Sequence, residues 1–313
     1  MSAVHVVMHP RFPPEVDTAL RAMRGIVLHC PADEAGVVRS LDDGVQVLVT
    51  FTWRPEFQRP SLRWIAGTGA GIEQYPLEQL HECGVALTTA AGVHAACVAE
   101  HAFALMLALM RRIGEAARNM TQCRWQALPG EQLAGKKLAI VGLGRIGEQV
   151  ALRAQSWDMQ IVGVKRQPKD YQGCVMDVRG IDQLDAVCEW ADIVLLSAPA
   201  RPDRSCLIGA PQLERLGRGW IVNVGRGSLI DEPALVQALA SGRLRGAGLD
   251  VTAVEPLPAA SPLWRLPNVV ITAHNAGDSP NYGPRWGALF ERNLAAFIGA
   301  GDWVNRVPAG GTQ

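Results

Sequence analysis

Three side chains able to do acid–base and electrostatic chemistry, Arg226, Glu255 and His274, each follow an apolar run typical of a buried strand. Because the carboxyl ends of parallel strands meet at one edge of a sheet, we expect the three groups to share a crevice. Hydride transfer to a ketone needs a cation that polarises the carbonyl and an acid that protonates the developing alkoxide. Arginine suits the first role, and a histidine beside a carboxylate suits the second. The alternative is an ion-pair cluster without a catalytic role.

Such a transfer also needs a hydride donor, and a glycine-rich turn earlier in the chain is the candidate binding site for it. Gly142, Gly144 and Gly147 have the G-x-G-x-x-G spacing, between an apolar run at 138–141 and a helical pattern at 148–157. The first glycine permits a sharp turn, the second lets the backbone approach a pyrophosphate, and the third lets helix and strand pack closely. Since the sequence holds 32 glycines, a plain structural turn is the alternative. The flanking strand and helix favour dinucleotide binding.

The end of the next predicted strand, at 161–164, indicates which dinucleotide is used. An NAD enzyme places a carboxylate there for the adenosine ribose, whereas this chain has Lys165 and Arg166, with Lys169 close behind. Lysine and arginine can pair with the 2′-phosphate of NADP, which a carboxylate would repel. A solvated basic turn is the alternative. We expect NADP(H) to be preferred over NAD(H).

Composition limits the partners and the compartment. Thirty basic and thirty acidic residues leave no net charge, so nothing suggests nucleic acid or a membrane surface as a partner. The most apolar segment, 102–110, is too short to span a bilayer, and no signal-peptide pattern opens the chain. Seven scattered cysteines without a C-x-x-C pair favour reduced thiols. We therefore expect a soluble, cytoplasmic protein that binds a small molecule, with neither metal nor disulfide.

The order of apolar runs predicts an α/β fold with two parallel sheets. Strands are expected at 4–8, 25–29, 45–51, 62–66 and 85–88 in the first part, and at 138–141, 160–164, 192–197, 220–224, 246–251 and 268–272 in the second. A helix apolar nearly all round is expected at 94–113, as core or interface, and a connector at 119–135. Pro280 and Pro284 should break the chain before a final helix at 285–298. The glycine-rich turn at 67–71 reads most simply as a loop, although its amides could bind a carboxylate.

The sequence resembles the D-isomer-specific 2-hydroxyacid dehydrogenases, and within them the short glyoxylate/hydroxypyruvate reductases. The resemblance is carried in order by the glycine motif at Gly142, Val98-Ala-Glu-His101, Asn223-x-x-Arg-Gly227, Leu249-Asp-Val251 with Glu255-Pro256, and His274. One departure is Asn275, which follows His274 where the family has a small or branched apolar residue. We interpret His101, like His5, His9, His29 and His81, as a structural histidine.

The resemblance implies two Rossmann-like doubly wound domains with a cleft between them. A flavodoxin-like substrate domain would comprise 1–93 with 284–313, and a dinucleotide-binding domain 94–283. It implies a homodimer and NADPH-dependent reduction of a small 2-keto acid. It also implies that Arg226 binds the substrate carboxylate and carbonyl, that His274 is the acid–base, that Glu255 pairs with it and that Asp250 holds the nicotinamide carboxamide.

The expected site residues form two further groups. Substrate contacts are Gly69 and Ala70 through their amides, Arg226, and Phe51, in a place where the family varies. Cofactor contacts are Gly142, Gly144, Arg145, Ile146, Gly147, Lys165, Arg166, Ala198, Pro199, Val224, Gly225, Asp250, His274 and Ala276.

Two other functions compete with keto acid reduction. Some relatives of this fold act as dinucleotide-sensing corepressors, which can retain the same three catalytic residues. Others oxidise formate or phosphite; formate enzymes lack the glutamate, so Glu255 disfavours that branch, while phosphite oxidation stays open. The regulatory phosphoglycerate dehydrogenases carry an extra C-terminal domain for which we expect this chain to be too short. The particular 2-keto acid stays open.

Overall fold

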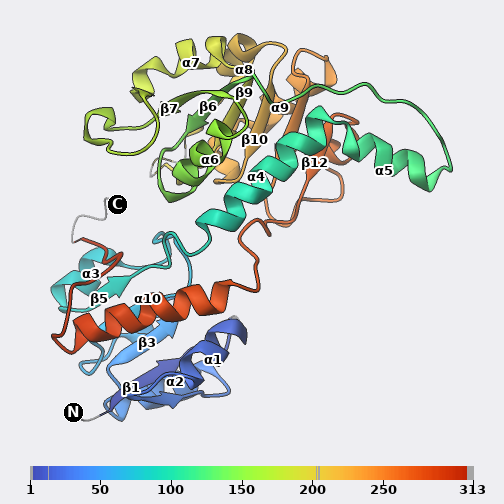
Figure 1. The fold of residues 1–313 in the computed structure, drawn as a ribbon. Helices are drawn as coiled ribbons and strands as arrows, with labels where there is room; N and C mark the ends of the chain where they lie inside the picture. Colours follow the sequence, from blue (N-terminus) through green and yellow to red (C-terminus); the bar gives the residue numbers. More distant parts are fainter. Residues whose placement is uncertain (1–2, 13, 202, 204, 309–313) are drawn as a thin grey trace. The chain divides into compact units, whose positions relative to one another are not determined.

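The protein consists of two compact units, each an α/β sandwich (Figure 1). The computed structural model describes residues 3–12, 14–201, 203 and 205–308. Internal contacts assign Met1–His94 and Asp278–Gln313 to unit 1 and Ala95–Gly277 to unit 2. The second segment of unit 1 therefore begins earlier than residue 284, where the sequence suggested it. Tyr282 accounts for this, because its ring is buried and its hydroxyl donates a hydrogen bond to the carbonyl of Thr68.

Unit 1 is built on a five-stranded sheet in the order β2-β1-β3-β4-β5, and all its strand pairings are parallel. This is the flavodoxin-like order. The strands are β1 (Val4–Met8), β2 (Ile26–His29), β3 (Val47–Thr50), β4 (Trp64–Gly67) and β5 (Ala86–Thr88). The helices are α1 (Pro14–Arg21), α2 (Glu34–Asp42), α3 (Leu77–Glu82) and α10 (Tyr282–Phe297), with a short 3-10 helix, η1 (Pro55–Phe57). Every residue of β3 and β4 is buried, since helices cover both faces of the sheet.

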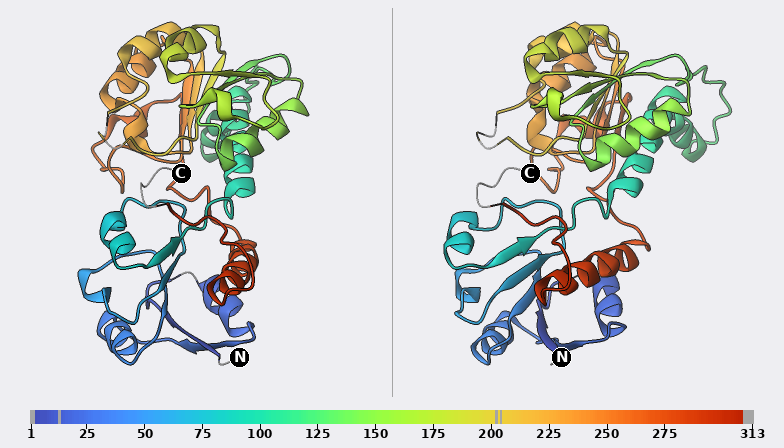
Figure 2. Two further views of the ribbon diagram at one scale, coloured as in Figure 1. Left: turned by 90° about the vertical axis from the view of Figure 1, so that its left-hand side faces the viewer. Right: turned by 60° about the vertical axis from the view of Figure 1, so that its left-hand side comes forward.

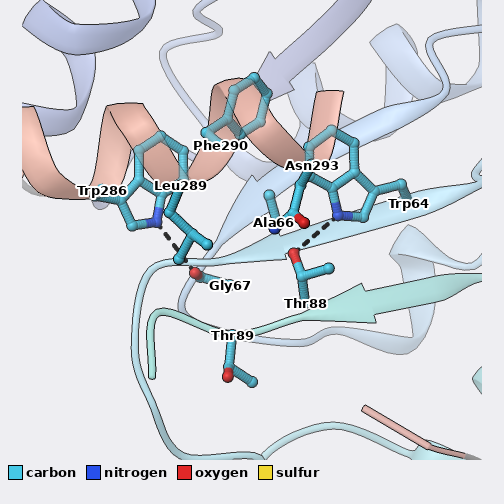
Figure 3. A pocket seen from close by; sticks show the side chains of 9 residues that line it. All are labelled: Trp64, Ala66, Gly67, Thr88, Thr89, Trp286, Leu289, Phe290 and Asn293. Atoms are coloured by element: carbon cyan, nitrogen blue, oxygen red, sulfur yellow. Dashed lines mark hydrogen bonds between the residues drawn. The ribbon is translucent and has the colours of Figure 1, made fainter. Parts of the chain in front are cut away.

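The C-terminal helix α10 completes the core of unit 1. Its aromatic side chains Trp286 and Phe290 stack in sequence against Trp64 of β4, with ring centroids 5.1 and 4.8 Å apart. The indole nitrogens are satisfied: Trp64 donates to the Thr88 hydroxyl and Trp286 to the carbonyl of Gly67. Figure 3 shows these residues around a small cavity of about 10 Å³, close to the lower limit for one water molecule.

Unit 2 contains a seven-stranded parallel sheet in the order β12-β11-β10-β9-β6-β7-β8. Counted from β6, this is the dinucleotide-binding order with one further strand at the end. The strands are β6 (Lys137–Val141), β7 (Gln160–Val164), β8 (Asp177–Arg179), β9 (Ile193–Leu196), β10 (Trp220–Asn223), β11 (Gly246–Leu249) and β12 (Val269–Ile271). The predicted fold class, two α/β domains with parallel sheets, is therefore confirmed. The order reverses between β6 and β9, and such a point is where ligands bind in sheets of this kind.

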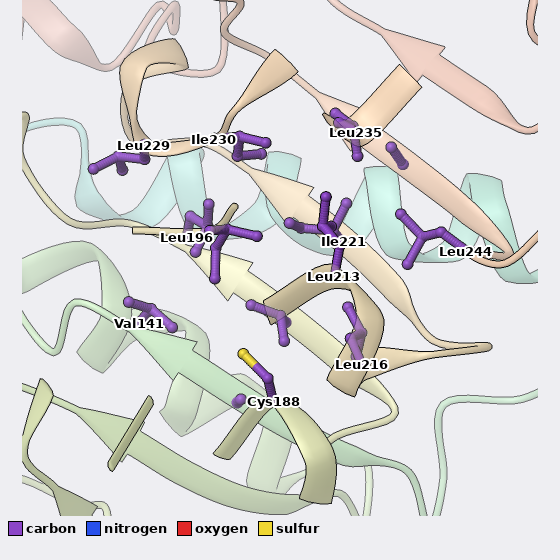
Figure 4. Packing of buried hydrophobic residues seen from close by; sticks show 14 of the residues in the cluster. Val141, Cys188, Leu196, Leu213, Leu216, Ile221, Leu229, Ile230, Leu235 and Leu244 are labelled. Atoms are coloured by element: carbon purple, nitrogen blue, oxygen red, sulfur yellow. The ribbon is translucent and has the colours of Figure 1, made fainter. Parts of the chain in front are cut away.

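Helices cover both faces of the unit 2 sheet (Figures 1 and 2). They are α4 (Ala95–Met110), α5 (Ile113–Thr121), α6 (Arg145–Gln155), α7 (Leu184–Trp190), α8 (Ala210–Leu216) and α9 (Glu232–Ala240). One core packs α4 and α6 on the sheet, and another packs α7, α8 and α9 on its opposite face. In the second core, drawn in Figure 4, Cys188 is buried among aliphatic side chains, and this burial raises the pKa of its thiol to about 12.

The long apolar helix expected at 94–113 ends early. Arg112 adopts a left-handed backbone conformation with φ of 56°, and α5 starts at the next residue in a new direction. The segment expected to be a connector from Asn119 onward is therefore helical up to Thr121, and the irregular part begins after it. A non-glycine residue in this conformation carries no clear sequence signal, which explains the error.

One further expectation, the start of the last helix, was wrong, and one strand was missed. Helix α10 begins at Tyr282, so Pro284 lies in its first turn, where an amide N–H would have no partner within the helix. Strand β8 was not expected at all, because Asp177–Arg179 lacks an apolar pattern. It forms at the edge of the sheet, where pairing with β7 on one side is sufficient.

Two other properties concern membrane association and metal binding. Within the described ranges, no helix is long and apolar enough to cross a membrane. The same residues hold no cluster of three or more histidine, cysteine or acidic side chains able to bind a metal ion. All seven cysteines are free thiols.

Replacing Leu196 of β9 by alanine should destabilise unit 2. Its side chain is fully buried in the core of Figure 4, so the change leaves a cavity that costs about 2–5 kcal/mol. Leu152→Ala on α6, where the leucine is 44% exposed, is the matched control and should cost less than about 1 kcal/mol. Urea unfolding followed by circular dichroism checks both variants. Equal shifts of the midpoint would contradict the described packing.

Candidate active site and dinucleotide motif

The glycine-rich turn lies where the strand order of unit 2 reverses. Gly142 follows β6 with φ of +106°, and a Cβ there would lie 2.5 Å from the backbone nitrogen of Ala198, which follows β9. A Cβ on Gly147 would lie 2.3 Å from the carbonyl oxygen of Gly142, so this glycine brings α6 against the strand. A Cβ on Gly144, by contrast, would meet nothing within 4 Å. The middle glycine therefore faces open space, whereas the first and third glycines lie against neighbouring backbone.

The open space faces the first turn of a helix. Gly144 is the N-cap of α6 and offers no side chain to its amides, and Arg145 and Ile146 follow it. Amides at a helix N-terminus form a binding site for a phosphate group. A pyrophosphate therefore fits the residues present. Gly144 has no side chain that would block its approach, and the amides at the N-terminus of α6 can bind it.

The basic residues at the end of β7 lie beside this turn. The ammonium group of Lys165 donates a 3.3 Å hydrogen bond to the carbonyl of Leu143, while Arg166 is exposed. The chain beyond them is fastened to α6, because the Tyr171 hydroxyl and the Cys174 amide both donate to the carboxylate of Glu148. Burial, together with this hydrogen bond, raises the pKa of Tyr171 to about 12. The tyrosine therefore stays a hydrogen-bond donor at all physiological pH values.

His274 and Glu255, expected to pair, lie in direct contact. The Nδ1 atom of His274 is 2.7 Å from Oε2 of Glu255, and the other carboxylate oxygen accepts a 3.1 Å hydrogen bond from the Thr252 amide. The His274 side chain is 51% exposed. Because Nδ1 is occupied by the carboxylate, Nε2 is the ring nitrogen left to exchange a proton with a ligand.

Arg226 stands on a turn that packs against the segment holding Glu255. The Asn223 side chain closes this turn, accepting from the Gly225 amide at 3.0 Å and donating to the Arg226 carbonyl at 2.9 Å. A Cβ on Gly227 would lie 1.9 Å from the Thr252 carbonyl oxygen, so the two backbones touch. The guanidinium donates to the Gly225 carbonyl within its own turn, and among the described residues it forms no hydrogen bond or ion pair with Glu255 or His274. All three groups thus lie at one edge of the sheet, and only two of them are in direct contact.

Asp250 occupies the centre of this edge, where its carboxylate is almost completely buried. It accepts hydrogen bonds from the Thr272 hydroxyl at 2.6 Å and from the amides of Asn275 and Ala276, both at 3.1 Å. His101 of α4 reaches the same cluster, with Nε2 2.8 Å from the Thr272 hydroxyl. The sequence did not single out Thr272 and led us to interpret His101 as structural, because nothing in either segment indicates that they meet.

The remaining cofactor candidates of unit 2 follow the ends of neighbouring strands. Ala198 and Pro199 come after β9, Val224 and Gly225 after β10, and Ala276 is buried after β12. A Cβ on Gly225 would lie 2.7 Å from the carbonyl oxygen of Ala198, so these two turns are in contact. The arrangement gives a continuous line of backbone from the glycine turn to the His274 turn.

The substrate candidates of unit 1 also gather at the end of its sheet. A Cβ on Gly69 would lie 2.5 Å from the ring of Phe51, which is 52% exposed. The carbonyls of the turn are used inside the unit: Gly67 accepts from Trp286, Thr68 from Tyr282 and Gly69 from the Ala90 amide. With the carbonyls directed inward, the amides of Gly69 and Ala70 are the groups that the turn can offer to an anion.

Comparison with known families matches both parts of the chain. The model of the D-isomer specific 2-hydroxyacid dehydrogenase NAD binding domain matches residues 103–276, and that of the catalytic domain of the same family matches residues 16–147. A glyoxylate reductase of Korarchaeum cryptofilum is 35% identical over 76% of this chain and 74% of its own length. A D-3-phosphoglycerate dehydrogenase of Methanocaldococcus jannaschii is 36% identical over 70% of this chain, but the match spans 42% of that protein.

Solved structures agree with the family models. An NADPH-dependent glyoxylate/hydroxypyruvate reductase of Sinorhizobium meliloti, solved with NADP and malonate, has a TM-score of 0.82. It is 28% identical, and the match covers 100% of this chain and 99% of that one. The glycine turn at a strand-order reversal and the family models lead to the same conclusion: this chain belongs to the D-isomer specific 2-hydroxyacid dehydrogenase family, whose members are oxidoreductases with an NAD(P)-binding domain.

Proposed function

We propose that the protein reduces a small 2-keto acid of the glyoxylate or hydroxypyruvate type to the D-2-hydroxy acid, with NADPH as the hydride donor. The observation that carries the proposal is the 2.7 Å contact between His274 Nδ1 and Glu255, beside the Arg226 turn. A paired imidazole next to an arginine is what protonation of an alkoxide and binding of a keto acid need. The names of the Korarchaeum and Sinorhizobium relatives support this class of substrate.

In this proposal each catalytic side chain has a defined role. The bound dinucleotide supplies the hydride. The guanidinium of Arg226 holds the carboxylate and polarises the keto group through charge-assisted hydrogen bonds. His274 gives the proton on Nε2 to the developing alkoxide, while Glu255 on Nδ1 stabilises the charged ring and fixes its orientation. The amides of Gly69 and Ala70 and the ring of Phe51, in unit 1, are proposed as further substrate contacts because the family resemblance implies them.

His274→Ala should abolish most of the reduction of glyoxylate or hydroxypyruvate by NADPH. Loss of a general acid lowers kcat by about a hundredfold or more, while the Kd for NADPH stays within about threefold. Arg226→Ala should lower kcat/KM by at least about a hundredfold, since two charge-assisted bonds are lost. Loss of NADPH absorbance measures the rates, and fluorescence titration measures the Kd.

His81→Ala is the matched control, because His81 is exposed on α3 of unit 1, away from every strand end discussed. It should react like the parent protein. If His274→Ala stayed within fivefold of the parent, the acid would have to be another group. If the parent protein reduced no 2-keto acid at all, the proposed function would be wrong.

The preference for NADPH is proposed from the basic turn. Lys165 is already directed at the glycine turn, and the exposed Arg166 follows it, so both can pair with a 2′-phosphate. No carboxylate follows β7 directly, where the ribose hydroxyls of NADH would need one. A phosphate bound at a partly exposed site contributes about 1–3 kcal/mol.

This contribution corresponds to a preference for NADPH over NADH of about tenfold to a hundredfold in kcat/KM. Arg166→Ala should reduce that preference by raising the KM for NADPH, with little change in the kinetics with NADH. Arg243→Ala removes the same charge from the exposed segment before β11, at the opposite edge of the sheet, and should change neither value. Equal use of both cofactors by the parent protein would contradict the proposed role of the turn.

We also propose that the protein is a homodimer that associates through α5 and the segment after it. Three large apolar side chains are exposed there: Ile113 is 55% exposed, Met120 78% and Trp125 fully exposed. Figure 1 shows α5 and this segment extending from the body of unit 2. Large apolar side chains exposed on one helix and the segment after it are a common feature of an interface between proteins.

Met120→Ser combined with Trp125→Ser should weaken the dimer and shift the mass measured by light scattering towards that of one chain. Met176→Ser is the matched control, since Met176 is 97% exposed at another place on unit 2. Its mass should remain that of the parent protein. A parent protein that is monomeric at micromolar concentration, or a double variant that stays dimeric, would argue against this interface.

A further inference from the structure

We infer that Asp250, with Thr272 and His101, is a positioning group for His274: the three residues fix the backbone of the turn that carries the catalytic imidazole. This inference rests on the proposed function, in which His274 is the acid. It assigns the buried carboxylate a task inside the protein, separate from the contact with the nicotinamide carboxamide that the family resemblance implies. It also gives α4 a direct connection to the site.

The backbone of His274 needs such support. Its φ is 53°, in the left-handed region that residues other than glycine seldom adopt. Three hydrogen bonds from the turn end on Asp250: the His274 amide donates to its carbonyl at 2.8 Å, and the next two amides donate to its two carboxylate oxygens at 3.1 Å each. One residue thus accepts from three consecutive amides, which fixes the turn in this conformation and directs Nδ1 of His274 at Glu255.

The Asp250 carboxylate is itself held in place by Thr272, which His101 contacts. The Thr272 hydroxyl donates to Oδ1 of Asp250 at 2.6 Å, and His101 Nε2 lies 2.8 Å from the same hydroxyl oxygen. A hydroxyl has a single proton, and here the carboxylate receives it. His101 must therefore donate to the hydroxyl, which means that its Nε2 carries a proton. A continuous series of hydrogen bonds then runs from α4 through Thr272 and Asp250 to the His274 turn.

The carboxylate has little capacity left for a ligand. Its side chain is 2% exposed. Oδ1 accepts two hydrogen bonds, from the Thr272 hydroxyl and the Asn275 amide, and also lies 3.4 Å from His101 Nε2. Oδ2 accepts one hydrogen bond, from the Ala276 amide. A carboxylate accepts about four hydrogen bonds in total. The three hydrogen bonds from Thr272, Asn275 and Ala276 are made within the protein and need no cofactor. Loss of the carboxylate therefore disturbs the His274 turn, with or without a bound dinucleotide.

A double-mutant cycle tests the inference. Asp250→Asn replaces one acceptor oxygen by a donor that faces a backbone amide, so the turn should loosen and kcat should fall by about tenfold or more. In the His274→Ala background the same change should lower the remaining kcat by less than about twofold, since no imidazole is left to position. The Kd for NADPH, from fluorescence titration, should change by less than about threefold in both backgrounds.

Two outcomes would overturn the inference. An equal loss of kcat in both backgrounds would mean that Asp250 acts independently of His274. An effect confined to the Kd and KM for NADPH would mean that it acts as a cofactor ligand alone. Thr272→Val should lower kcat in the same His274-dependent way, and Thr272→Ser, which keeps the hydroxyl, should restore most of the loss. Asp192→Asn, at the opposite edge of the sheet, is the matched control for the charge.

A measurement independent of turnover separates this inference from the proposed function. Nitrogen NMR of histidine-labelled protein reports the hydrogen bond between His274 and Glu255, with the signal assigned by its absence in His274→Ala. The signal should be lost or shifted in Asp250→Asn and unchanged in Asp192→Asn. An unchanged signal in Asp250→Asn would overturn the inference even in an inactive protein. Full activity of His274→Ala would overturn the proposed function instead, and the NMR result would still decide the positioning role.

Discussion

The close contact between the backbones of Gly142 and Ala198 is the constraint on which the unit 2 site depends. It occurs where the strand order reverses, so the chain leaves β6 and β9 in opposite directions and opens a space between them. All strand pairings of the unit are parallel, and the turns after β10, β11 and β12 therefore line the same edge. A side chain at position 142 would push the ends of β6 and β9 apart, and the turns that follow the strands would no longer keep their relative positions.

The strands that sequence predicted best are those buried on both faces. In β9 all four buried residues are aliphatic, and in β10 the first three of the four buried residues are apolar, so both strands appear in the sequence as apolar runs. Elements whose stability comes from a neighbour could not be found in this way. Asp177–Arg179 is a strand because β7 pairs with it, and α4 ends where Arg112 takes up a left-handed conformation. Neither cause is visible in the residues themselves.

The same distinction applies to the candidate site. His274, Glu255 and Arg226 could be proposed from sequence because each has a characteristic chemistry and follows a predicted strand. The cluster behind them could not, since the contact between His101 and Thr272 exists only after α4 has packed on the sheet. A histidine on an apolar helix reads as a structural residue. This interpretation was correct in that the side chain is hydrogen-bonded within the protein, and it gave no indication of which group the hydrogen bond supports.

The construction of unit 1 from two separate stretches has a consequence for the newly made chain. Its core needs Trp286 and Phe290 of α10, which stack on Trp64, and Asn305, whose amide donates to the carbonyls of Thr89 and Ala91. A ribosome makes all of unit 2 before it makes α10. During synthesis the five strands of unit 1 therefore wait with one face covered by α1 but not yet by α10 while the inserted unit is completed. The N-terminal part of this protein is translated first, yet it reaches its final structure last.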